Sequence, residues 1–301
     1  MDTDRLENLI QAVVRELEAV APGVPPQPGR PGPARPDPSG ELRIDLDEST
    51  GAQARTRSGI DAPVDADGLA ALMECTSSRI GVGRTGPCLR TRALNLFLSD
   101  LAITKDALAR EVDPALLADL GLFSVETRIT GGKEEYLLRP DLGRQLSPEA
   151  RAVIQQRCVA KPDLQICVGD GLSAQAVEAN LRKILPVLQA GCAQAGLKPG
   201  TPFFIHHCRV GVMNDIGDLL QPRVLILLIG ERPGLGRADS MSAYMGYQPR
   251  TGHTDAEREV ICNIFDGGGA NPLEAGAYAL RLAQRMLSRQ ASGVKLKMME
   301  D

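Results

Sequence analysis

The chain has 301 residues, 43% of them hydrophobic, and carries a net charge of −4 with an isoelectric point near 5.6. This length supports one large domain or two modest ones with a core, and the acidic balance, without a basic block interleaved with aromatic residues, excludes nucleic acid as an expected partner. The longest apolar run, 224–229, is far shorter than the ~20 residues of a membrane-spanning helix and the N-terminus lacks a signal-peptide core, so we expect no membrane partner and a cytoplasmic location.

Residues 1–20 are predicted to form an amphipathic helix, because apolar residues recur with the i, i+3, i+4, i+7 spacing of one helix face. Residues 21–60 are predicted to be a proline-rich linker, since eight of the 21 prolines lie between Pro22 and Pro38. Such a helix cannot bury its apolar stripe alone. It either docks on its own domain or serves as an address for another protein, and we favour the address.

Residues 61–160 are predicted to be mainly helical, with loops rich in glycine and arginine. Arg84, Arg90 and Arg92 could bind an acidic partner or a phosphate, or they could belong to a solvated helix start. Ser147 followed by Pro148 indicates the N-cap and first position of a helix that runs towards Cys158.

From residue 161 to 301 the pattern alternates between strands and helices. Strands are predicted at 164–168, at 202–205 continuing to Val210, and at 224–229, with a helix capped by Ser173 and a last helix capped by Asn271. The run 224–229 is apolar without alternation, which is typical of a strand covered on both faces. These segments predict an α/β fold with a Rossmann-like, doubly wound, mostly parallel sheet.

Glu231 follows the strand 224–229 directly, inside the glycine loop 230–236. Because parallel sheets bind ligands beyond the carboxyl ends of their strands, Glu231 is a candidate ligand-binding residue. The alternative is an ordinary ion pair with Arg232 or Arg237. The glycine loops 169–171 and 230–236 could each approach a phosphate, but neither has the complete dinucleotide-binding pattern.

A catalytic Cys–His pair has to be considered at His206, His207 and Cys208. Adjacent residues of a strand point to opposite faces, so at most one of the histidines could serve the cysteine. The seven cysteines are scattered without a Cys-x-x-Cys pair, which favours reduced thiols and no metal site. The sequence offers no self-contained catalytic set, and this suggests an active site shared with another polypeptide.

Six short motifs occur along the chain from about residue 70 to its end: Arg79–Pro87 with Thr91, Leu137–Arg144, Asp170–Ser173, Gly200–Phe204, Gly230–Gly236 and Ala291–Gly293. In the same order, they resemble motifs of the small (light) subunit of ethanolamine ammonia-lyase.

The resemblance implies an adenosylcobalamin-dependent ammonia-lyase that converts ethanolamine to acetaldehyde and ammonia by a radical mechanism. It implies a large-subunit partner that holds the substrate and the catalytic side chains, contacted by residues 61–160, with cobalamin bound between the two chains. The family's cobalamin contacts fall on Val210, Glu231 and Val260, or on Ile261 in place of Val260 if the alignment shifts by one residue. The N-terminal helix would then direct the complex to the shell of a bacterial microcompartment.

Two other functions remain open from the sequence alone. The first is a free-standing nucleotide- or phosphate-binding module whose glycine loops hold the phosphate. The second is a structural adaptor that stabilises a larger enzyme without contacting its cofactor.

Overall fold

The computed structural model describes residues 56–76, 78–235 and 237–299, which form parts of two compact units, Met1–Asp100 and Leu101–Asp301. The predicted N-terminal helix and residues 21–55 of the predicted linker lie outside the described residues. None of the helices in these described ranges has both the length and the apolar character to cross a membrane.

The first unit contains helix α4 (Ala66–Glu74), the short antiparallel strands β1 (Arg84–Thr85) and β2 (Cys88–Leu89), and the start of helix α5 (Thr91–Ala109). Asp65 caps α4 by accepting a hydrogen bond from the Gly68 N–H at 2.8 Å. Among the described residues 56–100, no hydrophobic side chain is buried. The described part of this unit therefore has no hydrophobic core of its own.

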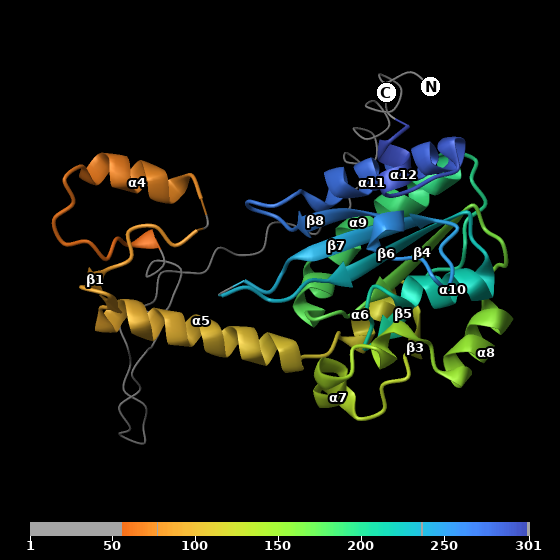
Figure 1. Ribbon diagram of the computed structural model, residues 1–301, viewed down its shortest axis with the longest axis horizontal. Helices are drawn as coiled ribbons and strands as arrows, with labels where there is room; N and C mark the ends of the chain where they lie inside the picture. The colour runs from red at the N-terminus through yellow and green to blue at the C-terminus, as the bar shows by residue number, and fades with distance from the viewer. Residues whose placement is uncertain (1–55, 77, 236, 300–301) are drawn as a thin grey trace. The chain divides into compact units, whose positions relative to one another are not determined.

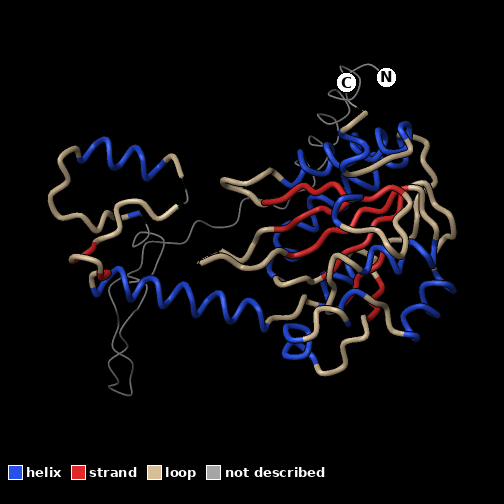
Figure 2. The backbone as a smooth tube through the Cα atoms, viewed as in Figure 1, coloured by secondary structure: helices blue, strands red, loops and turns tan. Residues whose placement is uncertain are grey.

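The second unit is built on a six-stranded sheet with the order β3–β5–β4–β6–β7–β8 (Figures 1 and 2). Strands β3 (Phe123–Glu126), β5 (Phe203–His206), β4 (Leu164–Gly169) and β6 (Val224–Gly230) are parallel. Strands β7 (Met241–Tyr247) and β8 (Arg258–Ile264) continue the sheet in antiparallel order. The fold is thus mixed α/β with a mostly parallel sheet.

Every residue of β4 and β6 is buried, because helices cover both faces of the sheet at these strands. On one face, Val224, Ile226 and Leu228 pack against the apolar sides of α9 (Ala174–Gln194) and α11 (Pro272–Arg289). On the other face, the alternate residues of β6 pack in a second cluster with α8 (Pro148–Arg157) and α10 (Val212–Leu220). The remaining short helices are α6 (Pro114–Asp119), α7 (Gly132–Leu138), η1 (Leu142–Arg144), η2 (Asp255–Glu257) and α12 (Val294–Lys297).

The structure confirms the predicted strands at 164–168 and 224–229 and the helix caps at Ser147, Ser173 and Asn271. The prediction that the second strand continues to Val210 is wrong. Strand β5 ends at His206, because His207 has a φ of 55° in the left-handed region and turns the chain out of the sheet. Strands β3, β7 and β8 were not predicted.

Candidate functional site

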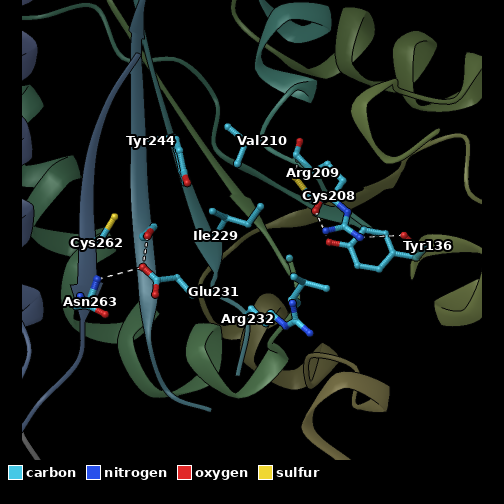
Figure 3. A pocket seen from close by; sticks show the side chains of 14 residues that line it. Tyr136, Cys208, Arg209, Val210, Ile229, Glu231, Arg232, Tyr244, Cys262 and Asn263 are labelled. Atoms are coloured by element: carbon cyan, nitrogen blue, oxygen red, sulfur yellow. Dashed lines mark hydrogen bonds between the residues drawn. The ribbon is translucent and has the colours of Figure 1, made fainter. Parts of the chain in front are cut away.

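A pocket of about 370 Å³ lies at the carboxyl ends of β4, β5 and β6 (Figure 3). The antiparallel strands β7 and β8 form one of its walls, and Tyr136 of α7 and the loop after β5 contribute to it from the other side. The residues that line it are Tyr136, Gly171, Leu172, Cys208, Arg209, Val210, Ile229, Gly230, Glu231, Arg232, Ser242, Tyr244, Cys262 and Asn263. This is where parallel sheets usually bind ligands.

Glu231 accepts hydrogen bonds from both strands of the antiparallel wall. The Ser240 hydroxyl donates to Oε2 at 2.9 Å and the Ser242 hydroxyl donates to Oε1. The Asn263 backbone N–H donates to Oε1 at 3.1 Å (Figure 3). Within the described residues, no ion pair joins Glu231 to Arg232 or Arg237, so the ion-pair alternative has no support. The carboxylate instead ties the end of β6 to β7 and β8.

The Asn263 N–H reaches Glu231 because β8 is irregular at this point. Between the pairs Met241–Ile264 and Ala243–Ile261, two residues of β8 stand opposite one residue of β7, which is a β-bulge. Asn263 has a φ of 56°, a conformation that asparagine tolerates better than most residues. The bulge brings Cys262 and Asn263 to the pocket.

On the opposite side of the pocket, Tyr136 and Arg209 are packed together (Figure 3). The Tyr136 hydroxyl donates to the Cys208 carbonyl oxygen at 2.7 Å, and burial raises the pKa of Tyr136. The Arg209 guanidinium lies 4.1 Å from the centre of the Tyr136 ring and donates to the Tyr136 carbonyl oxygen at 3.0 Å. These contacts order the loop that carries Val210.

Only two of the three predicted cofactor-binding residues lie in the pocket. Val210 and Glu231 both line the pocket, whereas Val260 is not among its lining residues. Val260 is 44% exposed and stands opposite Tyr244, so the two side chains share one face of the sheet, and Tyr244 lines the pocket. Ile261 pairs with Ala243 and packs on the other face, against the cluster that contains α9 and α11.

The two glycine loops contact each other. Gly171 has a φ of 55°, and an added Cβ there would collide with the Gly230 carbonyl oxygen. The Leu172 N–H donates to that same oxygen at 3.1 Å. These glycines therefore allow two loops to pack closely, and the contacts do not favour the phosphate-binding alternative.

The structure gives the Cys–His hypothesis no support. Cys208 is fully buried, and burial raises the pKa of its thiol well above the usual value, so the thiolate is disfavoured. Burial also lowers the pKa of His207. All seven cysteines are free thiols, and the described part of the chain contains no group of three or more His, Cys, Asp or Glu side chains that could hold a metal ion.

Sequence reasoning missed Tyr136, Ser242, Tyr244, Cys262 and Asn263 as pocket residues. Four of them come from β7 and β8. These two strands mix polar and apolar residues, so they lack the fully apolar pattern by which β4 and β6 were predicted. The turn residues near Gly252 between two runs that contain tyrosine, valine and isoleucine were the available signal for this hairpin.

The family model of the ethanolamine ammonia-lyase light chain (EutC) matches residues 66–297. The matched range contains the whole six-stranded sheet and every residue that lines the pocket. The match confirms the resemblance seen in the sequence motifs, and a light chain of this lyase implies a large-subunit partner. The chain belongs to the ethanolamine ammonia-lyase light chain family.

Proposed function

We propose that this chain is the small subunit of an adenosylcobalamin-dependent ethanolamine ammonia-lyase, which converts ethanolamine to acetaldehyde and ammonia, and that its pocket covers one part of the cobalamin. The observation that carries the proposal is a pocket at the carboxyl ends of β4–β6 with mixed apolar and polar walls, in a chain whose family is that of the lyase's light chain. When bound, the cofactor supplies the radical chemistry, and the protein supplies orientation and shielding.

The residues of the pocket fit part of a corrin ring. Val210, Ile229 and Tyr244 offer apolar surface to the ring, while Glu231 and Arg232 offer an acceptor and donors to the amide side chains at its edge. A volume of about 370 Å³ is too small for the whole cofactor. The remainder would be enclosed by the large subunit.

Val260 is retained as a proposed cofactor contact in preference to Ile261. Its exposed side chain extends the face of Tyr244 towards the edge of the sheet, where a ligand wider than the pocket would lie. Ile261 faces the opposite side and packs against buried side chains. A ligand on the pocket's face could reach Val260 without rearranging the core.

We also propose that residues 61–160 contact the large subunit, with residues 61–100 providing much of the surface. Within 56–100 the described residues bury no hydrophobic side chain, and a segment without a core needs another surface to pack against. Exposed apolar side chains are available for this contact: Val64, Leu72, Leu94 and Leu98. Leu94→Asp combined with Leu98→Asp should prevent co-purification with the large subunit while the sheet unit stays folded by circular dichroism.

Reconstitution tests the function. The chain is co-expressed with a large subunit, loaded with adenosylcobalamin, and assayed for ammonia release and for the cobalamin absorption spectrum. We expect activity in the complex and none in either chain alone. Full activity of the large subunit alone would contradict the proposal, and a cobalamin affinity that is insensitive to Glu231→Ala would favour the adaptor alternative.

The N-terminal segment supports a separate proposal, that residues 1–20 direct the complex to the shell protein of a bacterial microcompartment through the linker 21–60. Deletion of residues 1–40 should leave activity intact and abolish co-sedimentation with compartment shells. Continued co-sedimentation of the truncated complex would contradict it.

A further inference from the structure

The loop His207–Val210, between β5 and α10, forms one wall of the pocket, and distant segments of the chain hold it in place. The Arg209 N–H donates to the Gly143 carbonyl oxygen at 2.9 Å, and the Tyr136 hydroxyl donates to the Cys208 carbonyl oxygen. His207 is held with a φ of 55°, which a histidine adopts only at an energetic cost. The surrounding contacts must offset that cost.

Asp170, which follows β4 directly, provides the strongest of these contacts. Its two carboxylate oxygens accept separate hydrogen bonds, from the N–H of His207 at 2.9 Å and from the N–H of Cys208 at 2.9 Å. Its residue exposure is 2%, and the Lys133 ammonium lies 3.1 Å from Oδ2. A buried carboxylate with this set of partners is fully used by the protein and has little capacity left for a ligand.

The loop also lies directly on the end of β4. An added Cβ at Gly169 would lie 2.5 Å from both Cβ and Sγ of Cys208, so this position admits no side chain. Asp170 therefore binds the loop His207–Val210 at the point where the loop lies against the end of β4. The next two residues of the loop, Arg209 and Val210, line the pocket.

We propose that Asp170 is a positioning residue for the cobalamin site, which holds Arg209 and Val210 in their binding positions before the cofactor arrives, with Lys133 balancing its charge. This inference rests on the proposed function of the pocket. A loop already fixed in its bound conformation loses little conformational entropy on binding, and this raises affinity without a direct contact.

The test uses the complex with the large subunit and the variant Asp170→Asn. This substitution keeps the shape of the side chain but places an amide NH₂ against a backbone N–H. We expect about a tenfold rise in the dissociation constant of hydroxocobalamin, measured by equilibrium dialysis, as the loss of one charge-assisted hydrogen bond implies. In the cofactor-free complex, hydrogen exchange of the peptide that spans 203–212 should become faster. In the activity assay of the variant complex, the KM for adenosylcobalamin should rise by a larger factor than kcat falls.

Asp163→Asn is a matched control, because Asp163 stands before β4 at the other end of the same strand. Asp163 also accepts a backbone hydrogen bond, from Lys198 at 2.9 Å, and pairs with Arg223 at 3.0 Å. Its substitution should reduce stability but leave the cobalamin dissociation constant unchanged. Equal effects of the two variants on that constant would overturn the positioning role.

Lys133→Met decides the question if Asp170→Asn fails to assemble, because it leaves the Asp170 carboxylate buried without its charge partner and so disturbs its hold on the loop, while both carboxylate oxygens remain. A raised dissociation constant with faster loop exchange supports the proposal, and wild-type values overturn it. If Glu231→Gln weakens cobalamin binding while Asp170→Asn does not, the positioning role is wrong and the proposed function stands. If neither variant changes binding, the proposed function fails with it.

Discussion

Replacing Glu231 should disturb both the antiparallel wall and the cofactor affinity, by amounts that follow from its hydrogen bonds. In Glu231→Gln, one oxygen can still accept from the Asn263 N–H and from Ser242, and the Ser240 hydroxyl can reverse to accept from the new NH₂. Charge-assisted bonds then become neutral ones, which costs about 1–2 kcal/mol at this partly exposed position. Glu231→Ala removes all three acceptor contacts and should cost about 2–4 kcal/mol.

Two measurements separate these effects. Hydrogen exchange of the peptide that contains β8, 258–264, should accelerate slightly in Glu231→Gln and strongly in Glu231→Ala, since the bulge loses its anchor. Cobalamin binding to the Glu231→Ala complex should weaken by ~1–3 kcal/mol, which corresponds to about a 5- to 150-fold rise in the dissociation constant.

Glu257→Ala provides the control at the other end of β8. Glu257 also accepts a backbone hydrogen bond, from Thr254 at 2.6 Å, and a hydroxyl hydrogen bond from the same residue at 2.9 Å. Its loss should affect the η2 turn and leave cobalamin affinity unchanged. If Glu231→Ala changed neither the exchange of β8 nor the affinity, or if Glu257→Ala changed the affinity equally, the reasoning would be refuted.

Three further outcomes follow from the second unit. Gly171→Ala should destabilise the fold by more than ~2 kcal/mol, because the added Cβ meets the Gly230 carbonyl. Gly196→Ala should cost about 1 kcal/mol, because Gly196 has a φ of 66° but open space around it. Equal midpoints of urea unfolding for the two variants would contradict this. A maleimide should label the exposed Cys262 in the folded chain, and bound cobalamin should protect Cys262 from this labelling. The buried Cys208 should react only after unfolding. Mass spectrometry of the labelled peptides checks both outcomes. The Lys198 N–H lowers the pKa of Asp163 from its usual value of 3.8. The stabilisation by this carboxylate is therefore present above pH 3.8 and is lost as the pH falls through the lower pKa of the folded state. Asp163→Asn should flatten the acidic part of the plot of unfolding free energy against pH, measured in urea, and an unchanged plot would refute the assignment.

The sequence predicted the centre of the sheet well because its physical signals are local. Strands β4 and β6 are apolar throughout since both of their faces are buried, and the caps at Ser173 and Asn271 depend on side-chain oxygens next to a helix start. Strands β7 and β8 escaped prediction because part of one face is exposed and because a bulge breaks their alternation. The turn near Gly252 marks a hairpin locally, but the pairing of β7 with β6 joins segments that no local pattern connects.

The candidate site also contains features that the sequence predicted and features that it did not. The position of Glu231 at the end of a buried strand was predictable, but its partners Ser240, Ser242 and Asn263 were not, because they belong to the hairpin that was missed. The end of β5 was misplaced because His207 adopts a positive φ that only tertiary contacts can hold. Those contacts come from Asp170, which is 37 residues earlier in the chain.

The bulge at Cys262 and Asn263 has a consequence for the behaviour of the chain in solution. β8 is the last strand of the sheet, and an exposed edge strand can pair with the edge of another copy and start aggregation. A bulge interrupts the regular spacing of backbone donors and acceptors that such pairing requires. Because Glu231 holds the bulge through the Asn263 N–H, the carboxylate that shapes the pocket also protects the sheet from edge-to-edge association.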